Sequence, residues 1–162
     1  MSQNGKFVRE SISDYSELAL PNDANALGNL LGGKIMHLVD LAGAIAAMRH
    51  SGKVVVTASI DQMQFIHPVK IGQLVRLRAS VNRAFHTSME VGVKVWMEDL
   101  LTGREQHVSS AFLTFVAIDA EGKRGEIPSV IPETVDELRR YDEAGKRREY
   151  RLARRAAKFV AS

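Results

Sequence analysis

The stretch IMHLVDLAGAIAAM, residues 35–48, decides the fold of this chain. Only His37 and Asp40 interrupt its apolar residues, and its Ala, Leu and Met content favours an α-helix. A helix that is apolar on nearly all sides is buried rather than placed on a surface. Basic residues and a glycine follow in residues 49–52, which is the usual signal for a helix end. The stretch therefore predicts one buried helix of about 20 Å.

Strand-like segments surround this helix. One segment of mixed polarity precedes it and four segments follow it: residues 7–18, then residues 54–66, 73–85, 89–97 and 105–118. Apolar and polar residues alternate in the later segments, as they do in antiparallel strands with one buried face, and the connections are short enough for hairpins. One flat sheet cannot bury a helix on most sides, so we expect an α+β fold in which an antiparallel sheet wraps around the long central helix. Such a sheet leaves one edge open, which predicts a dimer.

The composition is typical of one folded domain. Of the 162 residues, 45% are hydrophobic and 25% are charged. The chain has no cysteine, which excludes disulfides, thiolate metal sites and a cysteine nucleophile. No apolar run is long enough for a transmembrane helix, and no secretory signal is visible. We therefore expect a cytoplasmic protein without a membrane partner.

The composition changes after Gly122, where Pro128 and Pro132 mark a linker, and a charged, Ala-rich helix should follow over residues 133–160. Residues 139–158 contain nine Lys or Arg and three acidic residues, whereas the rest of the chain is mildly acidic. A basic patch of this kind suggests an anionic partner. We expect a domain over residues 1–125, then a linker and a basic C-terminal helical tail over residues 126–162.

Asp40 is the costly residue of the buried helix, because aspartate is rarely buried without a partner and is a poor helix former. It is either a carboxylate held for acid–base or nucleophilic chemistry, or a structural group at a subunit interface. His37 lies three residues earlier on the same helix face, where it is either part of a catalytic pair or an ordinary hydrogen-bonded histidine.

The residues before the helix offer a second candidate feature. Gly28, Gly32 and Gly33 precede it, and the N–H groups of a helix N-terminus can polarise a carbonyl oxygen as an oxyanion hole does. Asn25 lies just before them and could orient a water or a carbonyl, although the whole segment could also be a plain turn. The chain has no GxGxxG, P-loop, HExxH or GxSxG pattern, so we expect no metal site and no serine nucleophile.

Three stretches, residues 23–40, 56–72 and 87–93, resemble in order the motifs of the cytosolic acyl-CoA thioesterases, or acyl-CoA hydrolases. The resemblance covers roughly residues 7–120. It implies the hotdog fold, a dimer and often a trimer of dimers. It also implies hydrolysis of acyl-CoA to a carboxylic acid and CoA without a separate cofactor, because CoA is part of the substrate and of the product.

The same resemblance implies roles for single residues. Asp40 would be the catalytic carboxylate, acting as general base or as nucleophile, and Asn25 would reach it from the other subunit. For a thioester substrate, the helix N-terminus itself predicts that the carbonyl binds at the backbone N–H groups of Gly32 and Gly33. The cationic residues expected to bind the phosphates of CoA are Arg83, Lys94, Arg147, Arg148 and Arg151. Thr87, Ser88 and Met89 of the third stretch would also bind CoA.

Two other functions stay open at this point. A hotdog protein can bind acyl-CoA without hydrolysing it, as a ligand sensor, but such a protein would lack a functional carboxylate at Asp40. The basic tail could instead bind nucleic acid, but the acidic body and the sparse aromatic residues of the tail argue against this partner. We therefore expect acyl-CoA and further copies of the chain as the partners.

Overall fold

The computed structural model describes residues 4–61 and 63–161. Its helices and strands follow in chain order: β1 (Lys6–Phe7), η1 (Val8–Glu10), β2 (Ser13–Leu18), η2 (Pro21–Asp23), α1 (Gly32–Ser51), β3 (Val54–Asp61), β4 (Leu74–Ala84), β5 (Ser88–Glu98), β6 (Glu105–Ile118), β7 (Val130–Ile131) and α2 (Val135–Ala161). No helix in these two ranges is both long and apolar enough to cross a membrane.

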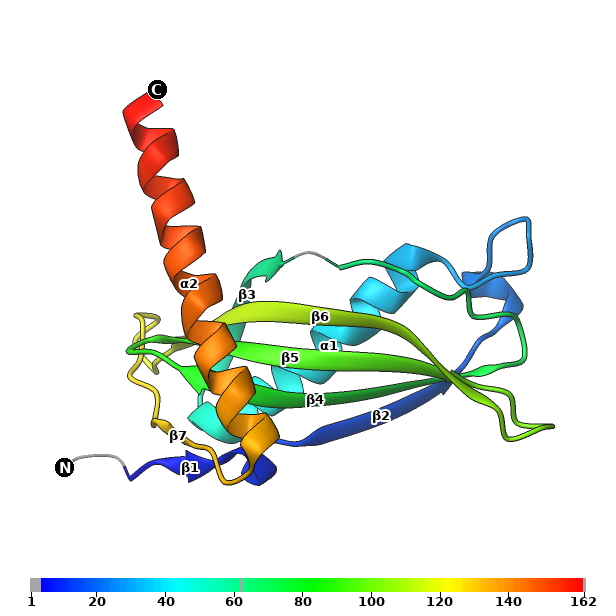
Figure 1. The fold of residues 1–162 in the computed structure, drawn as a ribbon, viewed down its shortest axis with the longest axis horizontal. Coiled ribbons are helices and arrows are strands. Elements are labelled where there is room, and N and C mark those ends of the chain that lie inside the picture. Colours follow the sequence, from blue (N-terminus) through cyan, green and yellow to red (C-terminus); the bar gives the residue numbers. More distant parts are fainter. Residues whose placement is uncertain (1–3, 62, 162) are drawn as a thin grey trace.

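A curled five-stranded sheet forms the body of the molecule, with strand order β2-β4-β5-β6-β3 and antiparallel pairing throughout. α1 lies along one face of this sheet, and α2 crosses the other face and extends past it (Figure 1). This arrangement confirms the predicted α+β fold with a sheet around a central helix. β3 lies at one edge of the sheet, and no other strand covers that edge among the described residues.

The core lies between α1 and the sheet. α1 contacts all five strands, and alternate residues of β4, β5 and β6 are fully buried against it, as period-two alternation requires. Gly43 permits the closest approach, because a Cβ at this position would lie 3.1 Å from the ring of Phe115 on β6. A larger residue here would push the helix away from the sheet.

The central elements match their predicted ranges closely, but three boundaries were wrong. The strand predicted over residues 7–18 begins only at Ser13, because the Ser11 hydroxyl closes a turn on the Val8 carbonyl oxygen (2.7 Å). The strand predicted to end at residue 66 ends at Asp61. Beyond it, the Gln64 carbonyl oxygen accepts a hydrogen bond from the Ser109 hydroxyl (2.6 Å) instead of from a strand N–H group.

The third boundary concerns the glycines that were expected to precede the helix. Leu31 has an extended backbone and forms the N-cap, so Gly32 and Gly33 belong to the first turn of α1 itself. The helix therefore starts three residues before the apolar stretch that predicted it. This shift places the two glycine N–H groups at the positive end of the helix dipole.

The sheet does not surround α1 completely, which corrects the expectation of burial on nearly all sides. Met36, Leu41 and Met48 are between 41% and 43% exposed on α1, and Val54 and Val56 are exposed on the edge strand β3. Five strands curl over one side of the helix only. The exposed flank is apolar and continuous with an open strand edge, which is what a second copy of the chain would cover.

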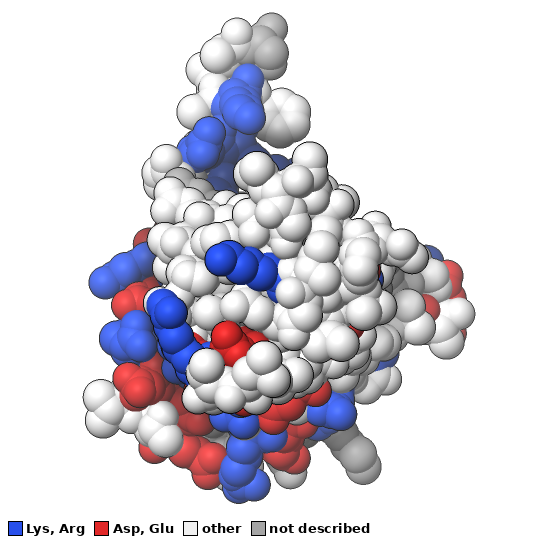
Figure 2. Space-filling view, turned by 90° about the vertical axis from the view of Figure 1, so that its right-hand side faces the viewer, with Lys and Arg blue, Asp and Glu red and all other residues white. Residues whose placement is uncertain are grey.

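α2 has two parts with different surroundings. Its first half packs on β4, where Ala144 is fully buried. Its second half extends away from the body, and Leu152 and Val160 are exposed there (Figure 1). The end of the molecule seen in Figure 2 is largely uncharged in its upper part, with Lys and Arg side chains on the projecting helix above it.

Candidate active site

Asp40 lies half-buried on α1, on the side of the helix that faces the edge strand β3. Its Oδ1 accepts a hydrogen bond of 2.6 Å from the hydroxyl of Thr57 on β3. The pairing of β3 with β6 shifts register between Thr57 and Ser59, and such a bulge re-aims the side chains beside it. The Asp40 carboxylate is thus oriented by the hydroxyl of a residue that lies at a β-bulge.

Thr57 is the functional candidate that the sequence analysis missed. It lies within the stretch VVVTAS and was given no role of its own. The only available signal was a hydroxyl where the preceding residues of the strand are valines. His37, in contrast, is exposed on α1 and remains an untested candidate.

The N-terminus of α1 leaves donors for a ligand. The hydrogen bonds of its first turn begin with the N–H groups of Lys34 and Ile35, both of which bond to the Leu31 carbonyl oxygen. No side chain caps this end of the helix among the described residues. A Cβ built at Gly33 meets nothing within 4 Å, so a ligand can approach the backbone closely there.

Asn25 lies beside this helix end, and a pocket of about 340 Å³ is lined by Asn25, Gly32 and Ile35 among others. The Asn25 Oδ1 accepts hydrogen bonds from the N–H groups of Leu27 (2.9 Å) and Asn29 (3.2 Å), as in an Asx turn. These two bonds fix the amide and leave its Nδ2 donors for a ligand. The structure therefore brings together two predicted site features, the asparagine and the helix N-terminus.

Asp40 does not line this pocket. It is seven positions after Gly33, which corresponds to about 10 Å along an α-helix. The Asp40 carboxylate therefore lies about two helix turns from the Gly33 N–H group. The predicted catalytic residues therefore form two half-sites in one chain, one with Asp40 and Thr57 and one with Asn25 and the first turn of α1.

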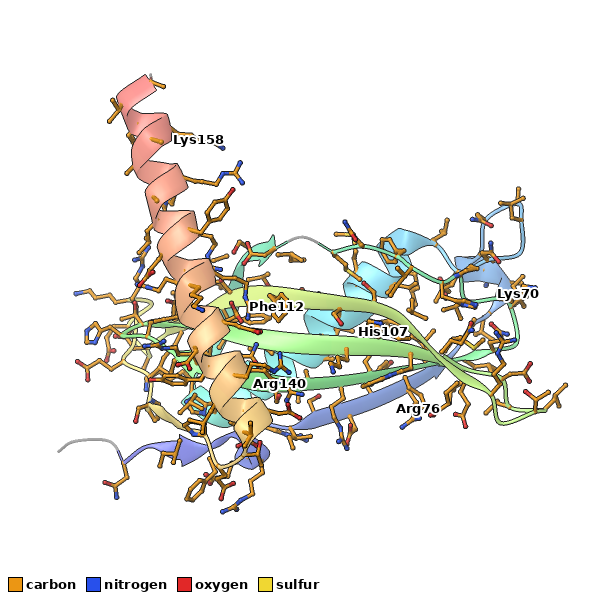
Figure 3. All side chains as sticks on the ribbon, viewed as in Figure 1. Lys70, Arg76, His107, Phe112, Arg140 and Lys158 are labelled. Carbon is orange, nitrogen blue, oxygen red and sulfur yellow. The ribbon has the colours of Figure 1, made fainter. Side chains whose placement is uncertain are left out.

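A basic groove lies on the face of the sheet that α2 crosses. It has a volume of about 710 Å³, and one wall contains Ala58 and Ser59, which directly follow Thr57 on β3. Thr87 and Ser88, at the turn into β5, also line it. The opposite wall is basic and comes mainly from the second half of α2: Arg124, Arg148, Arg151, Arg154, Arg155 and Lys158. Lys158 lies near the projecting end of that helix (Figure 3).

Arg148 is the cation of this groove best placed to bind an anion. Its Nη1 donates to the Ser88 hydroxyl oxygen (3.1 Å), and its guanidinium lies 4.2 Å from the centroid of the Phe85 ring. Burial, with further contributions from Arg151 and Arg83, lowers the pKa of Arg148 from its ordinary value. No acidic side chain pairs with it in the described part of the chain. An anion entering the groove would supply the missing negative charge.

The other predicted CoA-binding residues have different surroundings. Arg151 pairs with Asp61 (2.6 Å), and Arg83 lies over the ring of Tyr141 (4.1 Å to the centroid). Arg83 does not line the groove, and neither do the remaining three residues: Arg147 pairs with Glu90, the Met89 side chain is fully buried in the core, and Lys94 is exposed elsewhere on β5. No group of three or more His, Asp or Glu side chains in residues 4–61 and 63–161 is arranged to hold a metal ion.

Comparisons with known proteins agree with this architecture. The family model of the Thioesterase superfamily matches residues 27–103. The chain is 37% identical to an uncharacterized acyl-CoA thioester hydrolase of Bacillus subtilis over 93% of its own length and 87% of that protein. It is 40% identical to acyl-coenzyme A thioesterase 11 of Mus musculus over 85% of its length, but it spans only 23% of that longer protein.

Solved structures give the same result. An acyl-CoA hydrolase from Staphylococcus aureus in complex with butyryl coenzyme A, coenzyme A and coenzyme A disulfide is 36% identical, with a TM-score of 0.87 over 97% of this chain and 99% of that one. Variants of that hydrolase with an aspartate, an asparagine or a threonine replaced by alanine have also been solved. An apo-hexameric acyl-CoA thioesterase is 39% identical, with a TM-score of 0.91 over 95% and 99% of the two chains.

These similarities extend over 85–98% of the chain. They confirm the resemblance seen in the sequence and the class of enzyme that it implied, a thioester hydrolase of the hotdog fold. The chain belongs to the acyl-CoA thioesterase (acyl-CoA hydrolase) family of the thioesterase superfamily.

Proposed function

We propose that this protein hydrolyses acyl-CoA to a carboxylic acid and free CoA, with Asp40 as the catalytic carboxylate. The observation that carries the proposal is the hydrogen bond that the Thr57 hydroxyl donates to the Asp40 carboxylate. The basic groove on the α2 face of the sheet offers cations to the phosphates of CoA, and Ala58 and Ser59 in its wall directly follow Thr57 on the edge strand. Family membership supports the same reaction.

The complete site is built from two copies of the chain. In one chain Asp40 is about 10 Å along the helix from Gly33, and we infer that the half-site with Asn25 comes from another copy. The exposed apolar flank around Leu41 and the open edge of β3 support such a contact. An assembly of dimers into a hexamer, as in the apo-hexameric relative, remains part of this proposal.

The chemistry follows from the two half-sites. The N–H group of Gly33 and the Asn25 amide of one copy hold the thioester oxygen and stabilise the negative charge that develops on it. Asp40 of the other copy takes a proton from a water molecule whose oxygen attacks the carbonyl carbon. The C–S bond then breaks, and the CoA thiolate takes up a proton. Alternatively the Asp40 carboxylate attacks the carbon itself, and water hydrolyses the resulting anhydride.

The Staphylococcus aureus variants support this assignment. The replaced asparagine, aspartate and threonine of that hydrolase follow one another at intervals of 15 and 17 residues, and Asn25, Asp40 and Thr57 have the same order and the same intervals. Residue types and spacing therefore coincide at all three positions.

The substitution Asp40→Asn tests the proposal. It keeps the size of the side chain and an acceptor for Thr57, but it removes the base and the nucleophile. We expect kcat for thiol release from acyl-CoA to fall by a factor of about 10² to 10⁴, the usual contribution of a general base. The thermal unfolding midpoint should stay unchanged.

A panel of acyl chain lengths should be assayed, because the sequence does not fix the length preference. Turnover of the Asp40→Asn variant within twofold of the unmodified protein would refute the role of Asp40. Tight binding of acyl-CoA without thiol release by the unmodified protein would instead identify an acyl-CoA sensor.

A further inference from the structure

The buried acidic residue Glu90 has no part in the chemistry described above. Its side chain is fully buried on β5, between Met89 and Val91, whose side chains point into the core. Glu90 therefore lies on the opposite face of the sheet, where it bonds to Arg147 of α2. This is the face that α2 crosses (Figure 1). A buried carboxylate is costly and needs strong partners.

The partners of Glu90 come from a strand and a helix. Its Oε1 accepts hydrogen bonds from Asn82 Nδ2 (2.9 Å) and Arg147 Nη2 (2.7 Å), and its Oε2 accepts one from Arg147 Nε (2.9 Å). The Arg147 guanidinium also stacks 3.7 Å from the centroid of the Phe112 ring. Arg147 is thus held by a two-bond fork on its edge and by an aromatic ring on its face.

Such a buried pair fixes geometry more than it adds stability, because the cost of removing both charges from water offsets most of their attraction. The segment of α2 that this pair fixes lies next to the basic groove. Arg148 follows Arg147 directly, and Arg151, one turn later, has its Nη1 3.9 Å from Glu90 Oε2 and 2.6 Å from Asp61. Both Arg148 and Arg151 line the groove, whereas Arg147 does not.

We propose that Glu90 and Arg147 are positioning residues, which lock the rotation and the height of α2 on the sheet and so hold Arg148 and Arg151 where the phosphates of CoA bind. Arg147, a predicted CoA ligand, acts through Glu90 rather than by touching CoA. The inference rests on the proposed function, because the phosphate end of CoA is the ligand in question.

The substitution Arg147→Lys tests the lock without changing the charge of the molecule. Lysine cannot form the fork or stack as a planar group, so α2 loses its register while the groove keeps every cation. For acyl-CoA we expect KM to rise about tenfold and kcat to stay within about twofold. For the acyl-pantetheine of the same acyl chain, which lacks the nucleotide and its phosphates, both constants should stay unchanged.

Two further variants complete the test. Lys146→Ala is the control, because Lys146 is the exposed neighbour on the same helix and lies outside the network. It should leave the ratio of the two KM values unchanged. Asn82→Ala removes one donor to Glu90 without a charge change and should raise KM for acyl-CoA in the same selective way, to a smaller degree. This variant decides the question if Arg147→Lys does not fold.

The outcomes separate the inference from the proposed function. A selective rise of KM for acyl-CoA supports the lock. Equal KM values in variant and unmodified protein, or a proportional loss with both substrates, would overturn it. If the unmodified protein releases thiol from no acyl-CoA, the proposed function fails. The dissociation constants of free CoA and of pantetheine, measured by calorimetry on the same variants, then decide the inference. A selective rise of the dissociation constant of CoA supports the lock, and an equal change for both ligands, or none, overturns it.

Discussion

A single hydroxyl, that of Thr57, orients the carboxylate on which the proposed chemistry depends. Asp40 could be singled out from the sequence, because a carboxylate in an apolar helix is costly and demands an explanation. Thr57 could not, because its contact exists only where the edge strand passes the helix beside a bulge. A functional residue that is energetically unfavourable in its own segment can be recognised from the sequence, whereas a functional residue defined only by a tertiary contact cannot.

The substitution Thr57→Val measures the value of this hydroxyl. Valine has nearly the same shape but cannot donate to Asp40, so the carboxylate loses one bond of the charge-assisted kind. We expect kcat for acyl-CoA hydrolysis to fall by a factor of about 10 to 100 with little change in KM, in steady-state thiol-release kinetics. Thr57→Ser, which keeps the hydroxyl, is the matched control and should retain most of the activity. Equal kcat values for the Val and Ser variants would contradict the role of Thr57.

His50 is a second residue whose environment makes a prediction, here on stability. It is fully buried at the end of α1, and its Nε2 lies 2.7 Å from the Pro128 carbonyl oxygen. Burial lowers the pKa of His50 from its ordinary value of 6.5, although the Pro128 hydrogen bond works in the opposite direction. Lys6 also lowers this pKa, and Glu10 raises it. The folded protein therefore binds the proton less tightly than the unfolded chain.

The sign of the pH dependence follows from this difference. The stabilisation is present above the unfolded pKa and is lost as the pH falls below about 6.5, because the unfolded state then takes up the proton first. Urea unfolding at about pH 7.5 and about pH 5.5 checks it, with His50→Gln as control for the other titrating groups. The unmodified protein should lose more stability than the variant between these two conditions. The same loss in both proteins would show that His50 is not responsible.

Among the helices and strands, the sequence predicted the bounds of those elements that a local alternation of apolar and polar residues defines. β4, β5 and β6 agree with their predicted ranges within one residue at each end, because each alternates between a buried face and a polar face. The first strand was overextended because the turn at Ser11 is closed by its own hydroxyl, which also accepts from Val81 N–H (2.9 Å) across the fold. The curl of the sheet was predicted from the apolar helix that it has to bury. The path of α2 depends on contacts between distant segments, which no local pattern encodes.

The projecting half of α2 makes its own prediction. A chain that ends at residue 153 keeps the Glu90–Arg147 pair and the buried Ala144, but it loses the outer basic wall of the groove. We expect KM for acyl-CoA to rise and its dependence on salt concentration to become weaker, because fewer cations then attract the phosphates. Kinetics at several ionic strengths measure both effects, and the matching acyl-pantetheine is the control substrate. An unchanged KM with an unchanged salt dependence would exclude this wall from CoA binding.

For the whole molecule, the proposed function makes one chain an incomplete enzyme. The chain exposes an apolar helix flank and an open strand edge. Its two proposed half-sites lie about two turns of α1 apart. The dimer was predicted both from the open edge and from the family resemblance, and the resemblance also implied that Asn25 reaches Asp40 from the other subunit. The residues alone could not predict this sharing, because the separation of Asp40 from the first turn of α1 matters only once that turn is known to contain Gly32 and Gly33.

Complementation between two inactive variants shows whether the site combines residues of two copies. Asn25→Ala and Asp40→Ala should each abolish hydrolysis when expressed alone. In a co-expressed mixture, a hybrid dimer combines the intact Asn25 of one copy with the intact Asp40 of the other, and random pairing gives one working site in about four. We predict that the co-purified mixture recovers about a quarter of the turnover of the unmodified protein. A mixture that forms hybrids yet stays as inactive as its parents would show that the site lies within a single chain, and would contradict the account.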